Sequence, residues 1–391
     1  MIATIDDGPY TWSMTGALLQ TFPLGTQWPT IDPFLFCAHH CDNYPHGTEQ
    51  LGPDAPLAGR DIGSDFAGVD GWNMYHGSTV PGFPQHPHRG FETVTYVRTG
   101  FCDHSDSMGA TARFGRGDTQ WMTAGKGVVH CEMFPLLSFD EPNPLELFQI
   151  WLNLPAADKM VEPYFTMLWS HETPTVVVPS GDGDALVDIT VIAGSLDNAE
   201  APSPPPNSWA AKAEADVAIW HLRFDPGARW TMPAAGAESH RLLYAFSGSW
   251  LTIDGERLDA GNGAALDPSR PLELVAGDDG VECMVLQGRP IGEPVAQYGP
   301  FVMNTQAEIQ QAFDDYRRTQ FGGWPWGADD PDHGPTPRRF AHHADGRVEQ
   351  FDVEPVTTTA VTTAEVAERH VDTPDGTTTA LDTLVIARQP L

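Results

Sequence analysis

The chain has 391 residues, 41% of them hydrophobic, with 12 Trp and 19 Phe, which is enough for two compact domains with substantial cores. Its 53 acidic residues outnumber its 21 Lys and Arg, and the net charge of −32 argues against direct nucleic-acid binding, because such a surface repels phosphates. No run approaches the roughly 20 apolar residues of a membrane-spanning helix, so no membrane partner is expected. The chain has five cysteines, an odd number, and its N-terminus is acidic and polar, unlike a signal peptide. Both features favour reduced thiols in the cytoplasm.

The first fifty residues carry short apolar patches broken by Pro and Gly, such as GALLQTFPLG and IDPFLFCAHH. Because Gly and Pro are frequent throughout the chain, these patches favour strands, or a cap over a barrel, rather than helices. Cys37 and Cys41 flank His39 and His40. This cluster is either a second metal site or a pair of thiols. Thiols are favoured, because a zinc site needs four ligands and no second cysteine pair follows.

Residues 51–80 are rich in Gly, Asp and Pro and are typical of a long loop. Its GWNMYHG stretch has two interpretations. It either forms an aromatic wall beside the segment that follows, or it only packs as an ordinary loop. The sequence leaves both open.

Residues 81–132 carry the strongest functional pattern in the chain. His86 and His88 stand two residues apart before an alternating apolar run, and His130 and Glu132 stand two residues apart after a Gly-rich turn. A strand points alternate side chains to one face, so two such strands would direct three imidazoles and one carboxylate to one point. This donor set suits one divalent ion such as iron, manganese, nickel, copper or zinc. On the same strand, Cys131 is expected to point the opposite way.

The run of residues 81–155 is strand-like throughout, with FETVTYV, TQWM, GVVHCEMF and ELFQIWLNLP separated by Gly-rich turns. Short strands at this spacing favour a sandwich or small barrel. Gln120, Trp121 and Met122 belong to this run. They either line the metal pocket or pack the barrel.

The second half repeats this pattern after a Pro-rich connector at residues 198–208. Pairing RLLYAFSG with TVTYVRTG sets Gly248 against Gly100. In that alignment His240 falls opposite Glu92, whereas Ala234 and Gly236 take the places of the two paired histidines. We therefore expect a second barrel without metal ligands.

One helix is expected near the end of the second half. NTQAEIQQAFDDYRRTQFGG begins with an Asn or Thr cap, puts Ile309, Ala312, Phe313 and Tyr316 on one face, and should end at the Gly322–Gly323 pair. The remaining residues, 328–391, are rich in Thr, Asp and Pro. Within them VEQFDVEPV and TTALDTLVIARQ could be strands.

Three stretches, HPHRGFETVTY, GDTQWMTAGKGVVHCE and EPVAQYGPFVMNT, strongly resemble the pirins, two-domain members of the cupin superfamily. The likeness runs from about residue 32 to 326, with an inserted loop around 40–75. It implies an all-β bicupin, two jelly-roll-like β-barrels with a short C-terminal helix and a C-terminal tail. The expected divisions are 1–50 (strands or cap), 51–155 (metal-binding barrel), 156–300 (barrel without ligands), 301–327 (helix) and 328–391 (extension).

The resemblance also implies a site and an activity. Its ligands would be His86, His88, His130 and Glu132, its metal most often iron, and Glu92 the rival carboxylate. One implied function is quercetinase-type oxygenation, with a small phenolic substrate, dioxygen and Glu132 as general base. The alternative is a non-catalytic, iron-dependent redox sensor that binds a protein partner. Another phenolic or enol substrate is a third option.

Overall fold

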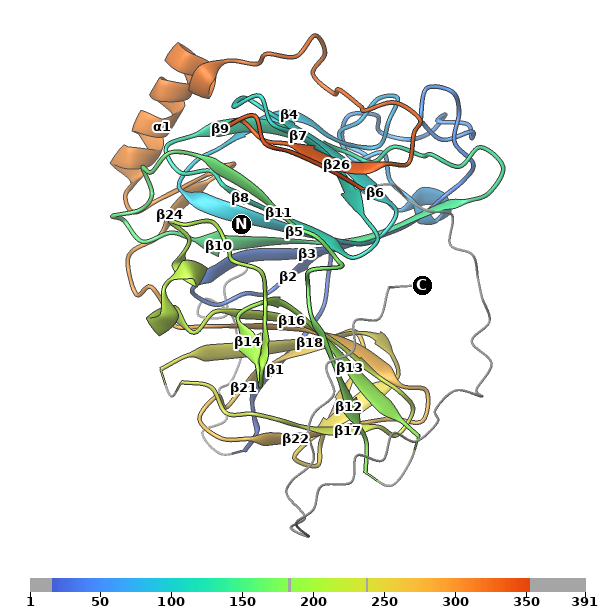
Figure 1. Cartoon of the computed structure of the whole chain (residues 1–391), viewed down its shortest axis with the longest axis vertical. Coiled ribbons are helices and arrows are strands. Elements are labelled where there is room, and N and C mark those ends of the chain that lie inside the picture. The colour runs from blue at the N-terminus through green and yellow to red at the C-terminus, as the bar shows by residue number, and fades with distance from the viewer. Residues whose placement is uncertain (1–15, 182–183, 237, 352–391) are drawn as a thin grey trace, which may run out of the picture.

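The computed structural model describes residues 16–181, 184–236 and 238–351. Figure 1 shows two β-barrels stacked one upon the other, the upper one built mainly from the first half of the chain and the lower one from the second. The expected all-β fold with two barrels is confirmed. Among the described residues, no helix is long and apolar enough to cross a membrane.

The first barrel consists of two facing six-stranded sheets. One runs, in spatial order, β11 (Tyr164–Leu168), β8 (Asp118–Thr123), β5 (Phe91–Thr99), β10 (Asn143–Asn153), β3 (Phe34–Tyr44) and β2 (Gln27–Trp28). The other runs β27 (Val348–Phe351), β26 (Arg339–His342), β7 (Thr111–Gly115), β6 (Phe101–Asp106), β9 (Val128–Met133) and β4 (Gly82–His88). All ladders in both sheets are antiparallel.

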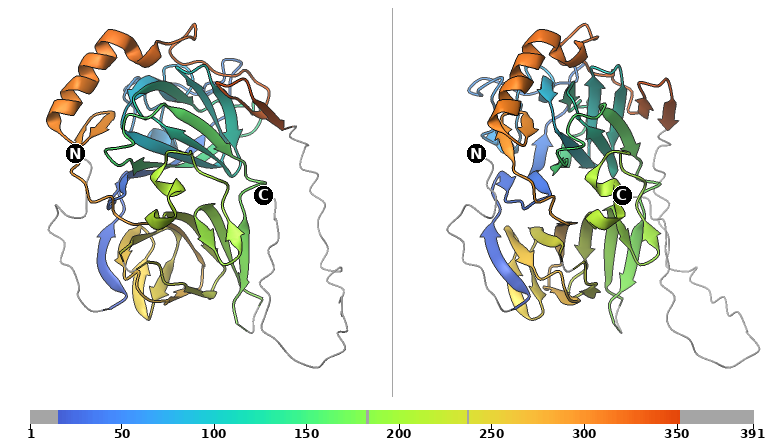
Figure 2. Two further views of the ribbon diagram at one scale, coloured as in Figure 1. Left: turned by 60° about the vertical axis from the view of Figure 1, so that its left-hand side comes forward. Right: turned by 90° about the vertical axis from the view of Figure 1, so that its left-hand side faces the viewer.

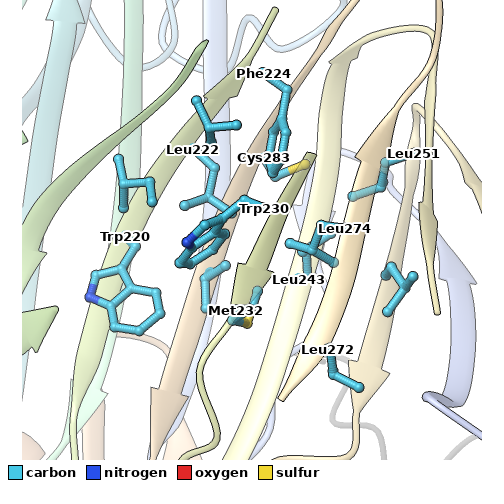
Figure 3. Packing of buried hydrophobic residues seen from close by; sticks show 14 of the residues in the cluster. Trp220, Leu222, Phe224, Trp230, Met232, Leu243, Leu251, Leu272, Leu274 and Cys283 are labelled. Carbon is cyan, nitrogen blue, oxygen red and sulfur yellow. The ribbon is translucent and has the colours of Figure 1, made fainter. Parts of the chain in front are cut away.

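The second barrel has a seven-stranded and a four-stranded sheet. The larger runs β1 (Leu18–Pro23), β21 (Asn262–Leu266), β18 (His240–Gly248), β23 (Val281–Gly288), β16 (Ala218–Phe224), β13 (Leu186–Ala193) and β12 (Thr175–Pro179). The smaller runs β17 (Arg229–Met232), β22 (Leu272–Ala276), β19 (Trp250–Ile253) and β20 (Glu256–Asp259). Apolar side chains from both sheets fill the space between them, with Trp220 and Leu222 of β16 facing Trp230 of β17 (Figure 3).

The N-terminal fifty residues supply a strand to each barrel. β1 pairs with β21 of the second barrel, whereas β3 pairs with β10 of the first. These early strands are therefore integral to the two sheets, and they tie the barrels together through the chain that joins them.

A shared apolar interface also joins the barrels. Strand alternation turns Val94, Phe148 and Ile150 of the first barrel outward, where they pack on Ile219 and Met284 of the second. An ion-pair network borders this interface. Arg98 contacts Glu146 of its own barrel at 2.8 Å and Glu282 of the other at 2.6 Å.

The expected helix is present as α1 (Gln306–Thr319) and lies beside the first barrel (Figure 2). Its N-cap Thr305 forms a capping box with Glu308. Ile309 and Ala312 are buried, and the rest of the predicted face packs on them. The helix ends earlier than expected, because Gln320 adopts the left-handed conformation before the glycine pair is reached.

The C-terminal extension adds strands to the first barrel. Of the two stretches expected to be strands, VEQF forms β27, and β26 joins it to β7. The other, TTALDTLVIARQ, lies outside the described residues. Minor elements complete the fold: β14 (Ser195–Leu196), β15 (Ala199–Glu200), β24 (Ala296–Tyr298), β25 (Phe301–Met303), and the 3-10 turns η2 (Val69–Gly71), η3 (Trp209–Ala211), η4 (Ala213–Ala215) and η5 (Gln320–Gly322).

Candidate metal centre

Three histidines meet inside the first barrel. His86 and His88 lie on β4 and His130 on the neighbouring β9, where His86 and His130 are directly paired across the ladder. One nitrogen from each ring lies within 4.8 Å of the others. β4 carries a bulge between Phe83 and His86, which sets this register. The structure thus brings together the three imidazoles that the sequence pattern predicted to converge.

Backbone carbonyls orient two of these rings. His86 Nδ1 donates to the Pro84 carbonyl at 2.8 Å, and His88 Nδ1 donates to the Pro300 carbonyl at 3.4 Å. A proton on Nδ1 leaves the Nε2 lone pair of each ring free to bind a metal. Pro300 precedes β25, so the segment leading to the helix helps to orient a histidine of the first barrel.

The cluster fits a divalent cation. His88 Nε2 and both ring nitrogens of His130 are buried without a hydrogen-bond partner among the described residues, an arrangement that costs free energy unless something binds there. Burial lowers the pKa of His86 to about 4 and the pKa values of His88 and His130 well below the ordinary range. All three rings are therefore neutral near pH 7, which is the form that ligates metals.

Glu132 lies next to this cluster on β9. Its Oε1 accepts a hydrogen bond from Thr95 Oγ1 at 2.8 Å, and its Oε2 accepts one from Gln149 Nε2 at 2.7 Å. Oε2 is 4.0 Å from His130 Nε2. Burial raises the pKa of the carboxyl, while the two hydrogen bonds act in the opposite direction. Glu132 as the fourth ligand stays a prediction.

Cys131, between His130 and Glu132, is buried in a separate cluster with Leu51, Val80 and Met133. Its side chain therefore leaves the opposite face of β9, as strand alternation predicts.

Glu92, the rival carboxylate, lies on the other face of β5 from Thr95. Its Oε1 accepts a hydrogen bond from Thr123 Oγ1 at 2.6 Å, and its Oε2 accepts one from Ser208 Oγ at 2.5 Å. Ser208 ends the Pro-rich connector of the second half. Glu92 thus holds that connector against the first barrel, and both of its oxygens are engaged away from the histidines.

Glu92 gives a pH-dependent prediction. Burial raises its pKa from 4.5 to about 7. Between these values the unfolded chain ionises the carboxyl while the folded protein keeps it protonated, so the free energy of unfolding falls as pH rises. The Glu92→Gln side chain does not titrate. The free energy of unfolding of this variant, relative to that of wild type, should therefore rise by roughly 3 kcal/mol between pH 4.5 and 8. Urea denaturation at both pH values measures this, and a pH-independent difference would contradict it.

A cleft of about 1750 Å³ opens beside the histidines. The loop of residues 51–80 contributes Tyr75 and His76 to its lining, and their rings lie 5.1 and 5.7 Å from that of Phe83. Phe83 in turn lies 6.4 Å from His86. The interpretation of this loop as an aromatic wall beside the metal segment is therefore the one that holds.

Three neighbouring residues of β8 were expected either to line the metal pocket or to pack the barrel, and the structure shows that they differ in this respect. Gln120 pairs opposite Thr95, on the inner face beside Glu132, and its buried amide has no hydrogen-bond partner in the part of the chain that the structure describes. Trp121 packs in the apolar interface between the barrels, and Met122 packs in a small cluster with Ala124 and Val128. Sequence reasoning missed Thr95 and Gln149, the two residues that hydrogen-bond Glu132. For Gln149 the available signal was a polar side chain inside the apolar alternation of ELFQIWL.

The Cys37 and Cys41 cluster does not form a second site. Cys37 is fully buried in the apolar interface, and Cys41 is exposed. In the described part of the chain, the single group of side chains positioned to hold an ion is His86, His88 and His130.

The second barrel presents no equivalent of the histidine cluster within the described residues. Gly100 directly follows β5 and Gly248 is the last residue of β18, and both have a positive φ, 79° and 91°. This similarity supports the alignment of the two halves. His240 Nδ1 donates to the Asp32 carbonyl at 3.0 Å, but the described residues place no cluster of ligand groups beside this ring.

Two stacked β-barrels, whose described residues place a histidine cluster in the first barrel alone, define a two-domain cupin with one candidate metal centre. The chain belongs to the pirin family. The family model described as Pirin matches residues 19–152, and the one described as Pirin C-terminal cupin domain matches residues 219–322.

Individual relatives agree with this assignment. Human pirin is 35% identical over 258 residues, which are 64% of this chain and 81% of pirin. A pirin-like protein of Caulobacter vibrioides is 36% identical over 240 residues, 61% of this chain and 80% of its own. A crystal structure described as quercetin 2,3-dioxygenase from Acinetobacter baumannii superposes with a TM-score of 0.61 at 25% identity, covering 78% of this chain and 98% of that one.

Proposed function

We propose that the protein is a quercetinase-type dioxygenase of flavonols or related phenols, with one divalent metal held by His86, His88, His130 and Glu132. The observation that carries the proposal is the cluster of three neutral imidazoles with free nitrogens beside an open cleft. Three histidines and one carboxylate leave positions free on a six-coordinate ion, as an open reactive site requires. The relative described as quercetin 2,3-dioxygenase supports the substrate class, and the family resemblance favours iron.

The reaction needs no external reductant. A flavonol and dioxygen give a phenolic ester and carbon monoxide: the O–O bond and two ring C–C bonds break, and the ring carbons supply the electrons that dioxygen takes up. The bound metal would chelate the flavonol hydroxyl and its neighbouring carbonyl and lower the pKa of that hydroxyl. The protein binds the substrate in the cleft and removes the hydroxyl proton.

Glu132 is the proposed general base. Burial raises the pKa of its carboxyl, which makes the carboxylate a stronger base than an exposed one. Thr95 and Gln149 fix its two oxygens beside His130, so the proton of a bound hydroxyl would be transferred to a carboxylate that is already oriented.

The test is incubation of chelator-stripped, metal-reloaded protein with quercetin in air and under nitrogen. We expect loss of the flavonol absorbance band and release of carbon monoxide in air alone. Unchanged absorbance in air, with metal content verified by elemental analysis, would contradict the proposal. Parallel loading with iron, manganese, nickel, copper and zinc identifies the active ion.

The alternative is a metal-dependent regulator that binds a protein partner without turnover. Its support is the surface: a net charge of −32 favours a basic partner, and Tyr298, which lines the cleft, is 67% exposed. A partner captured by the oxidised and not the reduced iron form, with no phenol consumed, would favour this alternative.

The cytoplasm is the proposed location. All five cysteines are free thiols, and four of them are buried. Free thiols persist in a reducing compartment such as the cytoplasm. Fractionation of cells that produce the protein tests this assignment.

A further inference from the structure

His40 lies on the same inner face of the first barrel as the group that orients Glu132. On β3, Ala38 pairs opposite Gln149 of β10, and His40 follows two residues later, about 7 Å along the same face. The residue between them, His39, faces the other way and stacks on Phe148 at 4.5 Å in the interface between the barrels. His40 is thus directed toward the metal side of the sheet.

The loop of residues 51–80 brings Tyr75 to this position. The Tyr75 hydroxyl donates to Asp42 Oδ2 at 2.6 Å. Asp42 Oδ1 accepts from the backbone and side-chain nitrogens of Asn73 at 2.8 and 2.9 Å. Burial raises the pKa of the Asp42 carboxyl, while its hydrogen bonds with Tyr75 and Asn73 act in the opposite direction. These three donors engage both oxygens, so the carboxyl accepts from Tyr75. Burial raises the pKa of Tyr75, so the phenol keeps the proton that it donates.

This arrangement determines the tautomer of His40. Its Nδ1 lies 2.9 Å from the Tyr75 hydroxyl, whose single proton is already directed at Asp42. Nδ1 must therefore donate, and it carries the ring proton. Burial and the neighbouring His39 lower the pKa of His40 to about 4, so the ring is neutral near pH 7. Nε2 therefore carries no proton and can accept a hydrogen bond.

The accepting nitrogen is free to meet a ligand. His40 lines the same cleft as His86. Its Nε2 has no hydrogen-bond partner among the described residues. This nitrogen is also absent from the set of unpaired side-chain atoms that are fully buried. The rings of His40 and Phe83 lie 5.9 Å apart, and those of Phe83 and His86 lie 6.4 Å apart. One aromatic side chain therefore separates His40 from the metal cluster, a span that a multi-ring phenol can bridge.

We propose that His40 Nε2 accepts a hydrogen bond from a hydroxyl group of the ligand held at the metal centre, and so selects polyhydroxylated phenols. Tyr75 and Asp42 are positioning residues that fix the His40 tautomer. The inference rests on the proposed function only in taking a phenol as the ligand. The tautomer itself is independent of any activity.

The tautomer is tested by nitrogen NMR of zinc-loaded protein labelled with 15N-histidine, with His40 assigned by its loss in His40→Phe. We expect the proton on Nδ1 in wild type. In Asp42→Asn the amide can donate to the Tyr75 oxygen, which turns the phenol proton to His40 Nδ1 and moves the ring proton to Nε2. A proton on Nε2 in wild type, or an unchanged tautomer in Asp42→Asn, overturns the inference.

Ligand selection is tested anaerobically with the same zinc-loaded protein and two probes. Quercetin carries hydroxyls remote from its chelating group, whereas 3-hydroxyflavone carries none. His40→Phe should weaken quercetin binding roughly 5- to 10-fold, the effect of one lost hydrogen bond, and leave 3-hydroxyflavone within about 2-fold. Thermal melting of the variant verifies its fold. Equal losses for both probes, or no binding of either, overturns the inference.

These measurements separate the inference from the proposed function. No flavonol is turned over without dioxygen, so the binding difference does not depend on catalysis. Absent turnover in air, together with selective weakening of quercetin in His40→Phe, would remove the oxygenase and leave the phenol subsite. Turnover in air, together with equal effects of His40→Phe on quercetin and 3-hydroxyflavone binding, would support the oxygenase and remove the phenol subsite.

Discussion

His86→Ala is expected to abolish stoichiometric metal binding. The substitution removes a ring whose Nε2 is free and whose Nδ1 is fixed by Pro84, and it leaves His88 and His130 without a third imidazole. Loss of groups that merely orient a ligand already weakens metal affinity about 10- to 100-fold, so loss of the ligand itself should exceed roughly 100-fold. Isothermal titration of chelator-stripped protein, with elemental analysis after dialysis, measures the change.

The matched control is His240→Ala in the second barrel. Its Nδ1 contacts the Asp32 carbonyl, and the described part of that barrel offers no cluster of ligands. We expect this variant to bind one ion with wild-type affinity. Loss of metal from His240→Ala, or full binding by His86→Ala, would show that the single-metal assignment is wrong.

Glu132→Gln is expected to reduce flavonol oxidation by about 10²- to 10⁴-fold, the usual contribution of a general base. The amide keeps the shape of the carboxylate beside Thr95 and Gln149 but cannot take the hydroxyl proton. Comparison of kcat at saturating metal with the metal dissociation constant separates loss of the base from loss of a ligand. An unchanged kcat with metal bound would exclude Glu132 as the base.

Cys131→Ala provides the control for Glu132→Gln. The thiol neighbours Glu132 in the chain but leaves the other face of β9, in the cluster with Leu51 and Val80. Its removal should cost some stability by leaving a small cavity and should leave kcat and metal affinity unchanged. A fall in kcat equal to that of Glu132→Gln would indicate general damage to β9 instead of loss of a base.

Local patterns in the sequence determined much of this protein. The i, i+2 spacing of His86 and His88 places both on one face of a strand, and the same alternation sends Cys131 away from His130. The Thr305 and Glu308 cap and the apolar face of α1 are equally local, because capping and helical periodicity act within a few residues. The repeated strand pattern of the second half predicted a second barrel, and the family resemblance implied the same arrangement.

Only the tertiary structure decided which distant segments meet. The Glu92 carboxylate is directed to Thr123 and Ser208, 31 and 116 residues away. Tyr75 reaches Asp42 and His40 across 33 and 35 residues, and β1 crosses to the second barrel. Alternation along a strand is a local property that residue order fixes, whereas the pairing of remote strands and the path of a long loop depend on packing over the whole chain. The metal cluster was therefore readable from the sequence, and the His40 subsite beside it was not.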